Sequence, residues 1–194
     1  MKTKKKKIRL FLILLSVLII VVLIFFFGSR KEKIKHVVKP SGTSSAVKPT
    51  KTVQMKKVTL FFLSEDDNLL HPEEREIQAS SSVNDEAKEL VEELIKGSKT
   101  GLLGPIPENT RVRQVFITSD GTAYVDLSRN LLGANYYGSS GEMAVVYSIV
   151  NSLAYNFKSV KKVSLLVEGN ERETLGGHID LSQPFVPDYS LVAR

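Results

Sequence analysis

The chain of 194 residues contains no cysteine. Disulfide bonds, thiolate zinc sites, a cysteine nucleophile and the lipid-modified cysteine of a lipoprotein are therefore excluded. A glycine-rich phosphate loop followed by lysine is also absent, and so are internal repeats. These absences leave few of the usual ways of building a catalytic or cofactor site.

Histidine is scarce, and His178 with Asp180 is the one pair that resembles a polar site. Side chains two positions apart in an extended segment face the same way, so the two could share a ligand or a proton. A metal site needs further ligands, and none is spaced nearby. The structural alternative is that both residues pin a turn at Gly176-Gly177. We therefore expect no metal and no cofactor.

Two further catalytic interpretations are weak. The run Gly138-Ser139-Ser140-Gly141 is one residue too short for a nucleophile elbow, and Ser139 with Glu142 predicts a helix-capping box instead. Asp126 and Glu142 could be a carboxylate pair for glycan hydrolysis, which needs a separation of roughly 5–10 Å. Nothing in the sequence sets that distance, so we expect no catalytic residues.

Charge is distributed unevenly along the chain. The first 57 residues hold 15 of the 27 Lys and Arg residues and a single acid, Glu32. The remaining residues have 12 bases and 20 acids, a formal charge of −8. An acidic domain argues against nucleic-acid binding, because that affinity comes from neutralising phosphates.

The N-terminal residues predict a membrane anchor. A basic tail, 1–9, precedes an apolar segment, 10–28, that is just long enough to span a bilayer as a helix. We expect an uncleaved anchor in the cytoplasmic membrane with the rest of the chain outside. A cleavable signal peptide is the alternative, but no small-residue cleavage site follows the apolar run.

Residues 29–56 predict a disordered stalk. They are rich in Lys, Ser, Thr and Pro and have no apolar periodicity, so they cannot bury enough surface to offset the entropy of ordering. A solvated tether is the simpler interpretation; contacts of its lysines with anionic lipid or wall polymer are the alternative.

Residues 57–187 predict one small α/β domain, followed by a C-terminal tail, 188–194. Strands are expected at Val58–Leu63, Glu74–Ala79, Arg111–Thr118, Thr122–Leu127, Lys162–Glu168 and Glu171–Leu175, and helices at Asn84–Lys96 and Ser139–Tyr155. Asn84 is the expected cap of the first helix. The fold class is α+β: a small mixed sheet with two helices on one face and a core of helix–strand–strand–helix–strand.

The second helix is apolar over an unusually broad face. Val145 and Ile149 lie beside a core stripe already filled by five residues, namely Met143, Val146, Tyr147, Val150 and Leu153. A helix deep in the core would explain this breadth. The alternative makes Val145 and Ile149 a candidate interaction surface.

Several motifs together resemble the GerMN domain family of sporulation and germination proteins. They include Gly101-Leu102 with Pro105-Ile106-Pro107, Asp120-Gly121-Thr122-Ala123-Tyr124-Val125-Asp126, Gly141-Glu142, Tyr147-Ser148-Ile149-Val150-Asn151, Leu166-Val167-Glu168-Gly169 and Thr174-Leu175-Gly176-Gly177-His178-Ile179-Asp180. The resemblance implies an extracytoplasmic domain without known enzymatic activity. It also implies a core similar to the ring-building motif of sporulation and secretion channels.

The functional expectation combines these points. A non-enzymatic scaffold or assembly module of the bacterial cell envelope, in sporulation or germination, agrees with the anchor, the stalk and the resemblance. Its expected partners are the membrane and either envelope proteins or further copies of itself. The alternative is a glycan-binding module or a peptidoglycan-acting enzyme. A concave pocket with carboxylates and a histidine would favour the enzyme, and an apolar surface would favour assembly.

Overall fold

The computed structural model describes residues 54–133 and 138–194, all within one compact unit. The predicted tail, the anchor at 10–28 and nearly all of the stalk lie outside these residues. No helix in the described ranges is long and apolar enough to cross a bilayer. Strand β1 begins at Met55, so the last residues assigned to the stalk belong to the folded domain.

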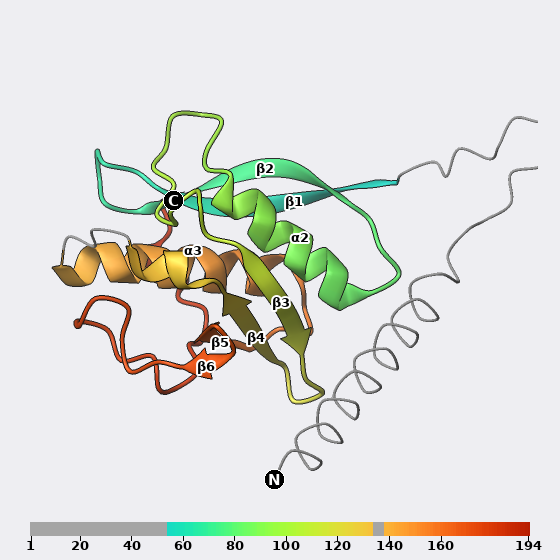
Figure 1. Cartoon of the computed structure of the whole chain (residues 1–194). Coiled ribbons are helices and arrows are strands. Elements are labelled where there is room, and N and C mark those ends of the chain that lie inside the picture. Colours follow the sequence, from blue (N-terminus) through green and yellow to red (C-terminus); the bar gives the residue numbers. More distant parts are fainter. Residues whose placement is uncertain (1–53, 134–137) are drawn as a thin grey trace, which may run out of the picture. The chain divides into compact units, whose positions relative to one another are not determined.

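The described residues form three layers (Figure 1). A hairpin of β1 (Met55–Leu63) and β2 (Leu70–Gln78) makes the first. Helices α2 (Val83–Ile95) and α3 (Gly138–Asn156) make the second. The third is a sheet of β3 (Val112–Ile117), β4 (Thr122–Leu127), β5 (Lys162–Val167) and β6 (Asn170–Glu171). Short 3-10 helices, η1 (Arg129–Gly133) and η2 (Tyr189–Leu191), complete the domain.

The four-stranded sheet is mixed, in the order β3-β4-β5-β6. β3 and β4 pair antiparallel around the Asp120-Gly121 turn, while β4 and β5 pair parallel across the α3 crossover. The predicted order of helix, two strands, helix and strand is confirmed as α2-β3-β4-α3-β5. The predicted second strand is longer than expected, since β2 begins at Leu70 rather than Glu74.

The β1–β2 hairpin changes the expected architecture. A single sheet with helices on one face would leave the far side of the helices exposed. Here α3 packs against β1 as well as against β5, so the helices are enclosed between two sheets. The core therefore contains apolar side chains from all three layers, including Leu60, Phe62, Leu90, Val125 and Leu165.

The predicted cap of α2 is wrong by two residues. Ser82 is the N-cap, and its hydroxyl accepts a hydrogen bond from the Asp85 backbone N–H. The side chain of Asn84 instead accepts a hydrogen bond from the backbone N–H of Ile117, at 3.1 Å. It thereby satisfies a donor on β3, the edge strand of the sheet.

Helix α3 is buried around most of its circumference, which explains its broad apolar face. Its C-terminal half also binds the backbone of β1. Asn156 accepts from the Thr59 N–H at 2.9 Å and donates to the Thr59 carbonyl at 2.6 Å, and the Ser152 hydroxyl accepts from the Phe61 N–H at 3.0 Å. These side chains take the place of a neighbouring strand along β1.

Candidate functional site

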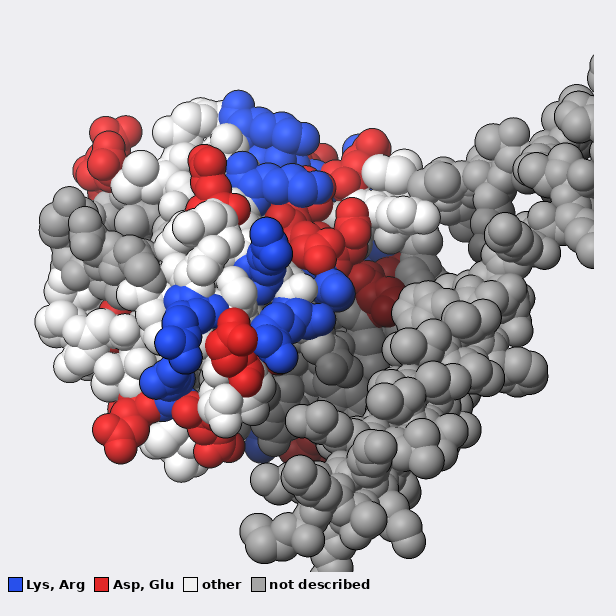
Figure 2. All heavy atoms as spheres, viewed as in Figure 1, with Lys and Arg blue, Asp and Glu red and all other residues white. Residues whose placement is uncertain are grey.

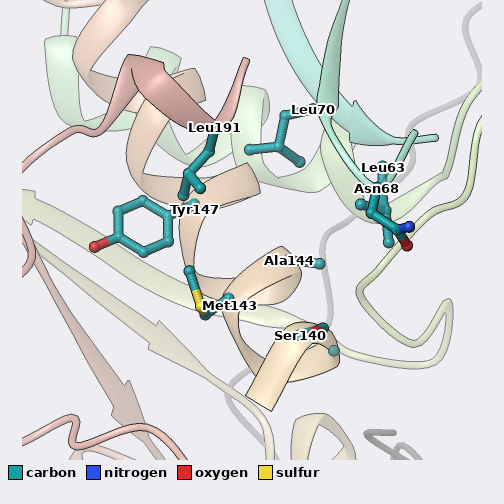
Figure 3. A pocket seen from close by; sticks show the side chains of 9 residues that line it. Leu63, Asn68, Leu70, Ser140, Met143, Ala144, Tyr147 and Leu191 are labelled. Carbon is teal, nitrogen blue, oxygen red and sulfur yellow. The ribbon is translucent and has the colours of Figure 1, made fainter. Parts of the chain in front are cut away.

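An apolar pocket opens between the N-terminal half of α3, the β1–β2 turn and η2 (Figure 3). Its volume is about 350 Å³. We call it the α3 pocket, lined by Leu63, Asn68, Leu70, Ser140, Gly141, Met143, Ala144, Tyr147 and Leu191. None of these is a carboxylate or a histidine.

Hydrogen bonds within the β1–β2 turn shape the rim of the pocket. The Ser64 N–H donates to the Leu69 carbonyl at 2.9 Å, and the Asn68 N–H donates to the Ser64 carbonyl at 3.0 Å. Asn68 has a φ of 57°, in the left-handed region that asparagine tolerates better than most residues. This side of the pocket is therefore preorganised by local sequence.

The tip of the same turn is acidic. Glu65, Asp66 and Asp67 follow one another and are exposed. Of these three, Asp67 contacts His71, whose Nε2 lies 2.8 Å from a carboxylate oxygen. A backbone hydrogen bond from Leu69, together with the contact to His71, lowers the pKa of Asp67. The lowered pKa keeps the Asp67 carboxylate charged at neutral pH.

Two exposed tyrosines contact each other near η2, whose Leu191 lines the pocket. Tyr155 near the end of α3 is 58% exposed, and Tyr189 in η2 is 46% exposed. Their ring centroids are 6.5 Å apart, and both rings contact Phe61 of β1. Such exposed aromatic side chains are typical of binding surfaces.

Glu142 and His178 form a second, buried polar contact. The carboxylate of Glu142 is fully buried and accepts hydrogen bonds from the His178 N–H, from His178 Nδ1 at 2.7 Å and from the Ile179 N–H. Burial by itself would raise the pKa of Glu142, but these hydrogen bonds lower it further than burial raises it. The carboxylate thus remains charged and ties the 176–179 loop to α3.

The structure separates the predicted polar pair. His178 binds Glu142, whereas Asp180 accepts a hydrogen bond from the Ser182 N–H and shapes its own turn. The predicted capping box is also wrong, because Glu142 reaches the 176–179 loop and not the start of its own helix. Asp126 binds Arg113 and the Gly169 N–H, so it shares no partner with Glu142. Among the described residues no group of three or more His, Asp or Glu side chains could hold a metal ion.

Val145 and Ile149 do not form a surface. Both side chains have 0% exposure and lie in the core shared by the helices and sheets. The interpretation of α3 as a core helix agrees with this burial. Sequence periodicity could not separate the two interpretations because the covering element, the β1–β2 hairpin, is distant in the chain.

The α3 pocket was missed by sequence reasoning. Its lining comes from β1, the turn before β2, the first half of α3 and η2, which are far apart in the sequence. A partial signal was present in the run Glu65-Asp66-Asp67 beside an apolar strand. Nothing in the sequence indicated that α3 and η2 would lie next to that turn.

Together, the αββαβ core and the apolar α3 pocket describe a small α+β domain. The sequence model of the Germane family, described as "Sporulation and spore germination", matches residues 59–173. This is more than half of the chain, so the chain belongs to the Germane family, and the predicted GerMN resemblance is confirmed.

Solved structures show the same fold. The tandem GerMN domains of the sporulation protein GerM from Bacillus subtilis share 24% identity with a TM-score of 0.56, over 69% of this chain and 46% of that chain. A putative lipoprotein from Clostridium perfringens also shares 24% identity, with a TM-score of 0.50, over 72% of this chain and 93% of that chain. This chain therefore spans about half the length of the tandem GerM structure. No curated protein matches it.

Proposed function

We propose that this chain is a non-enzymatic assembly module of the bacterial cell envelope that acts in sporulation or spore germination. The observation that carries the proposal is the family match over 59–173, whose description names both processes. The apolar lining of the α3 pocket and the exposed Tyr155 and Tyr189 support an interaction role over catalysis.

Membrane attachment is part of the proposal. The apolar segment 10–28 behind a basic tail supports a domain held outside the cytoplasm at the end of a stalk. Confinement to the membrane surface raises the effective concentration of partners, so that weak contacts become sufficient for assembly. A head-to-tail contact between such domains closes into a ring when its rotation permits.

The role is tested by deleting the gene in its native host. We expect fewer heat-resistant spores or slower germination, with recovery on expression of the full-length chain and no recovery from a chain lacking residues 1–28. Normal sporulation and germination in the deletion strain would contradict the proposed role. Release of sugars or peptides from purified peptidoglycan by the purified chain would favour the enzymatic alternative.

The proposed orientation of the chain in the membrane is tested separately. A reporter that is active only in the cytoplasm, fused after Arg194, is expected to be silent, while one active only outside should work. The opposite pattern would mean that the orientation is reversed.

A further inference from the structure

The α3 pocket is one part of a longer surface. Tyr147 lines the pocket, and Tyr155 lies about two helical turns further along α3. The short helix η2 runs beside them, with Leu191 in the pocket and Tyr189 against Tyr155. Helix η2 thus connects the pocket with the tyrosine pair, and the β1–β2 turn contributes Asn68 to the same pocket.

The formal charges next to the pocket, on Glu65 and Asp66 of the β1–β2 turn, are negative. The described lining of the pocket contains no Lys or Arg, and Glu65 and Asp66 in the adjoining turn make no ion pair within the described residues. A small group of acidic side chains lies at the end of the molecule where this turn lies (Figure 2). Uncompensated carboxylates beside an apolar pocket attract a positive charge and repel an anionic one.

We propose that the α3 pocket, the tyrosine pair and the acidic turn form a docking surface for a segment of a partner protein. That segment carries an apolar anchor side chain next to lysine or arginine. The inference rests on the proposed assembly function and names the surface and the chemistry of the partner. The apolar anchor enters the pocket, its basic neighbours face Glu65 and Asp66, and the rest of the segment lies on Tyr155 and Tyr189.

The size of the pocket favours a side chain as its occupant. A volume of about 350 Å³ is at the lower end of the range for small-ligand pockets, which suits one or two apolar side chains. Interfaces commonly concentrate their affinity in such an anchor, surrounded by tyrosines that exclude water. The acyl chain of an anionic lipid has suitable apolar character, but its headgroup would face the acidic turn and be repelled.

The first test measures binding of defined peptides to the full-length chain in lipid nanodiscs, because free detergent would compete for an apolar pocket. The probe is a short fluorescein-labelled peptide with a central Leu-Phe pair flanked by lysines, followed by fluorescence anisotropy. One matched peptide replaces the lysines with glutamates, and another replaces Leu-Phe with Ser-Ser. We expect only the first peptide to bind, with affinity that falls as salt is raised.

Variants then locate the binding. Ala144→Phe fills the pocket and Met143→Asp places a charge in its lining, and each should abolish measurable binding of the Leu-Phe peptide. Glu65→Lys combined with Asp66→Lys should weaken it about tenfold. Two matched controls lie outside the pocket lining. Glu108→Lys reverses the charge of an exposed acidic residue. Phe116→Ala removes a side chain of β3 that is 49% exposed. Both controls should bind like wild type, whereas Tyr155→Ala should bind more weakly.

Thermal unfolding of each variant shows whether it is folded. Ala144→Phe and Met143→Asp change the pocket in different ways, so a single folded variant is enough to test whether the peptide binds there. Equal binding of the lysine and glutamate peptides, binding by neither, or unchanged binding by a folded pocket variant would overturn the docking surface. These results are separable from the proposed function. A deletion strain with a sporulation defect whose protein binds no peptide would retain the function and lose this surface.

Discussion

Glu142 connects helix α3 with the 176–179 loop, which is distant in the sequence. Its buried carboxylate accepts two backbone N–H groups and the His178 ring. Replacing Glu142 with alanine leaves these donors without a partner inside the protein. We expect Glu142→Ala to lower the free energy of unfolding by about 3 kcal/mol, measured by chemical denaturation.

His178→Ala is the informative comparison. The His178 side chain is 47% exposed, and its removal leaves the backbone bonds of Glu142 in place. We expect a loss of about 1 kcal/mol or less. A larger effect of His178→Ala than of Glu142→Ala would show that the ring, and not the buried carboxylate, holds the loop.

Glu73 makes stability depend on pH. Burial would raise its pKa, but hydrogen bonds from Ser98, Thr100, the Lys99 N–H and Arg75 lower it to about 2. A depressed carboxylate pKa contributes stability above the unfolded value, and that contribution is lost as pH falls through the folded value. We therefore expect a contribution of about 3 kcal/mol to disappear between about pH 4.5 and pH 2.

Comparison of wild type with Glu73→Gln isolates this contribution from other carboxylates. The variant is less stable at neutral pH, and the difference between the two proteins should shrink on acidification, as followed by urea denaturation at several pH values. A difference that stays constant down to pH values near about 2 would contradict the proposed ionised state of Glu73.

At the scale of elements, α3 packs against strands of both sheets, β1 on one side and β5 on the other. Asn156 satisfies both backbone groups of Thr59, and Asn156→Ala leaves them without that partner. We expect a loss of about 2 kcal/mol, seen as a lower denaturation midpoint with an unchanged m-value. The control Asn170→Ala, at an exposed position of β6, should change stability by less than about 0.5 kcal/mol. Equal effects would mean that Asn156 contributes little to the attachment of β1.

At the scale of the whole molecule, the folded domain begins before Val58. Residues Met55–Lys57 pair with Glu76–Gln78 of β2. Lys56 also forms an ion pair with Glu86 at 2.6 Å, and its ammonium lies 4.9 Å from the centre of the Phe157 ring. A chain starting at Gln54 should therefore be more stable than one starting at Val58 by about 1–2 kcal/mol.

Both shortened chains should keep their melting temperature in the presence of a chelator, because the fold is expected to need no metal. Circular dichroism melts with and without chelator measure both quantities. A large drop in chelator would reveal a structural metal, and equal stability of the two chains would place the domain boundary at Val58.

Local patterns in the sequence were sufficient for most elements of the domain. The periodicity of α2, the hairpin around Asp120-Gly121 and the alternation in β5 predict those elements where the structure has them. Local chemistry was less reliable at the helix ends. Asn84 and Ser139 are plausible caps by residue type, but Ser82 caps α2, and Glu142, the assumed partner of Ser139, binds a distant loop.

The sequence by itself determined the αββαβ order, the family and the acidic character of the domain, because these depend on spacing, motifs and composition. Only the tertiary structure decided that Val145 and Ile149 are buried, that Glu142 binds His178 and that four separate segments enclose an apolar pocket. Each of these outcomes depends on which distant segment covers which face. Hydrophobic burial is non-directional, so an apolar stripe predicts that it will be covered without identifying the segment that covers it.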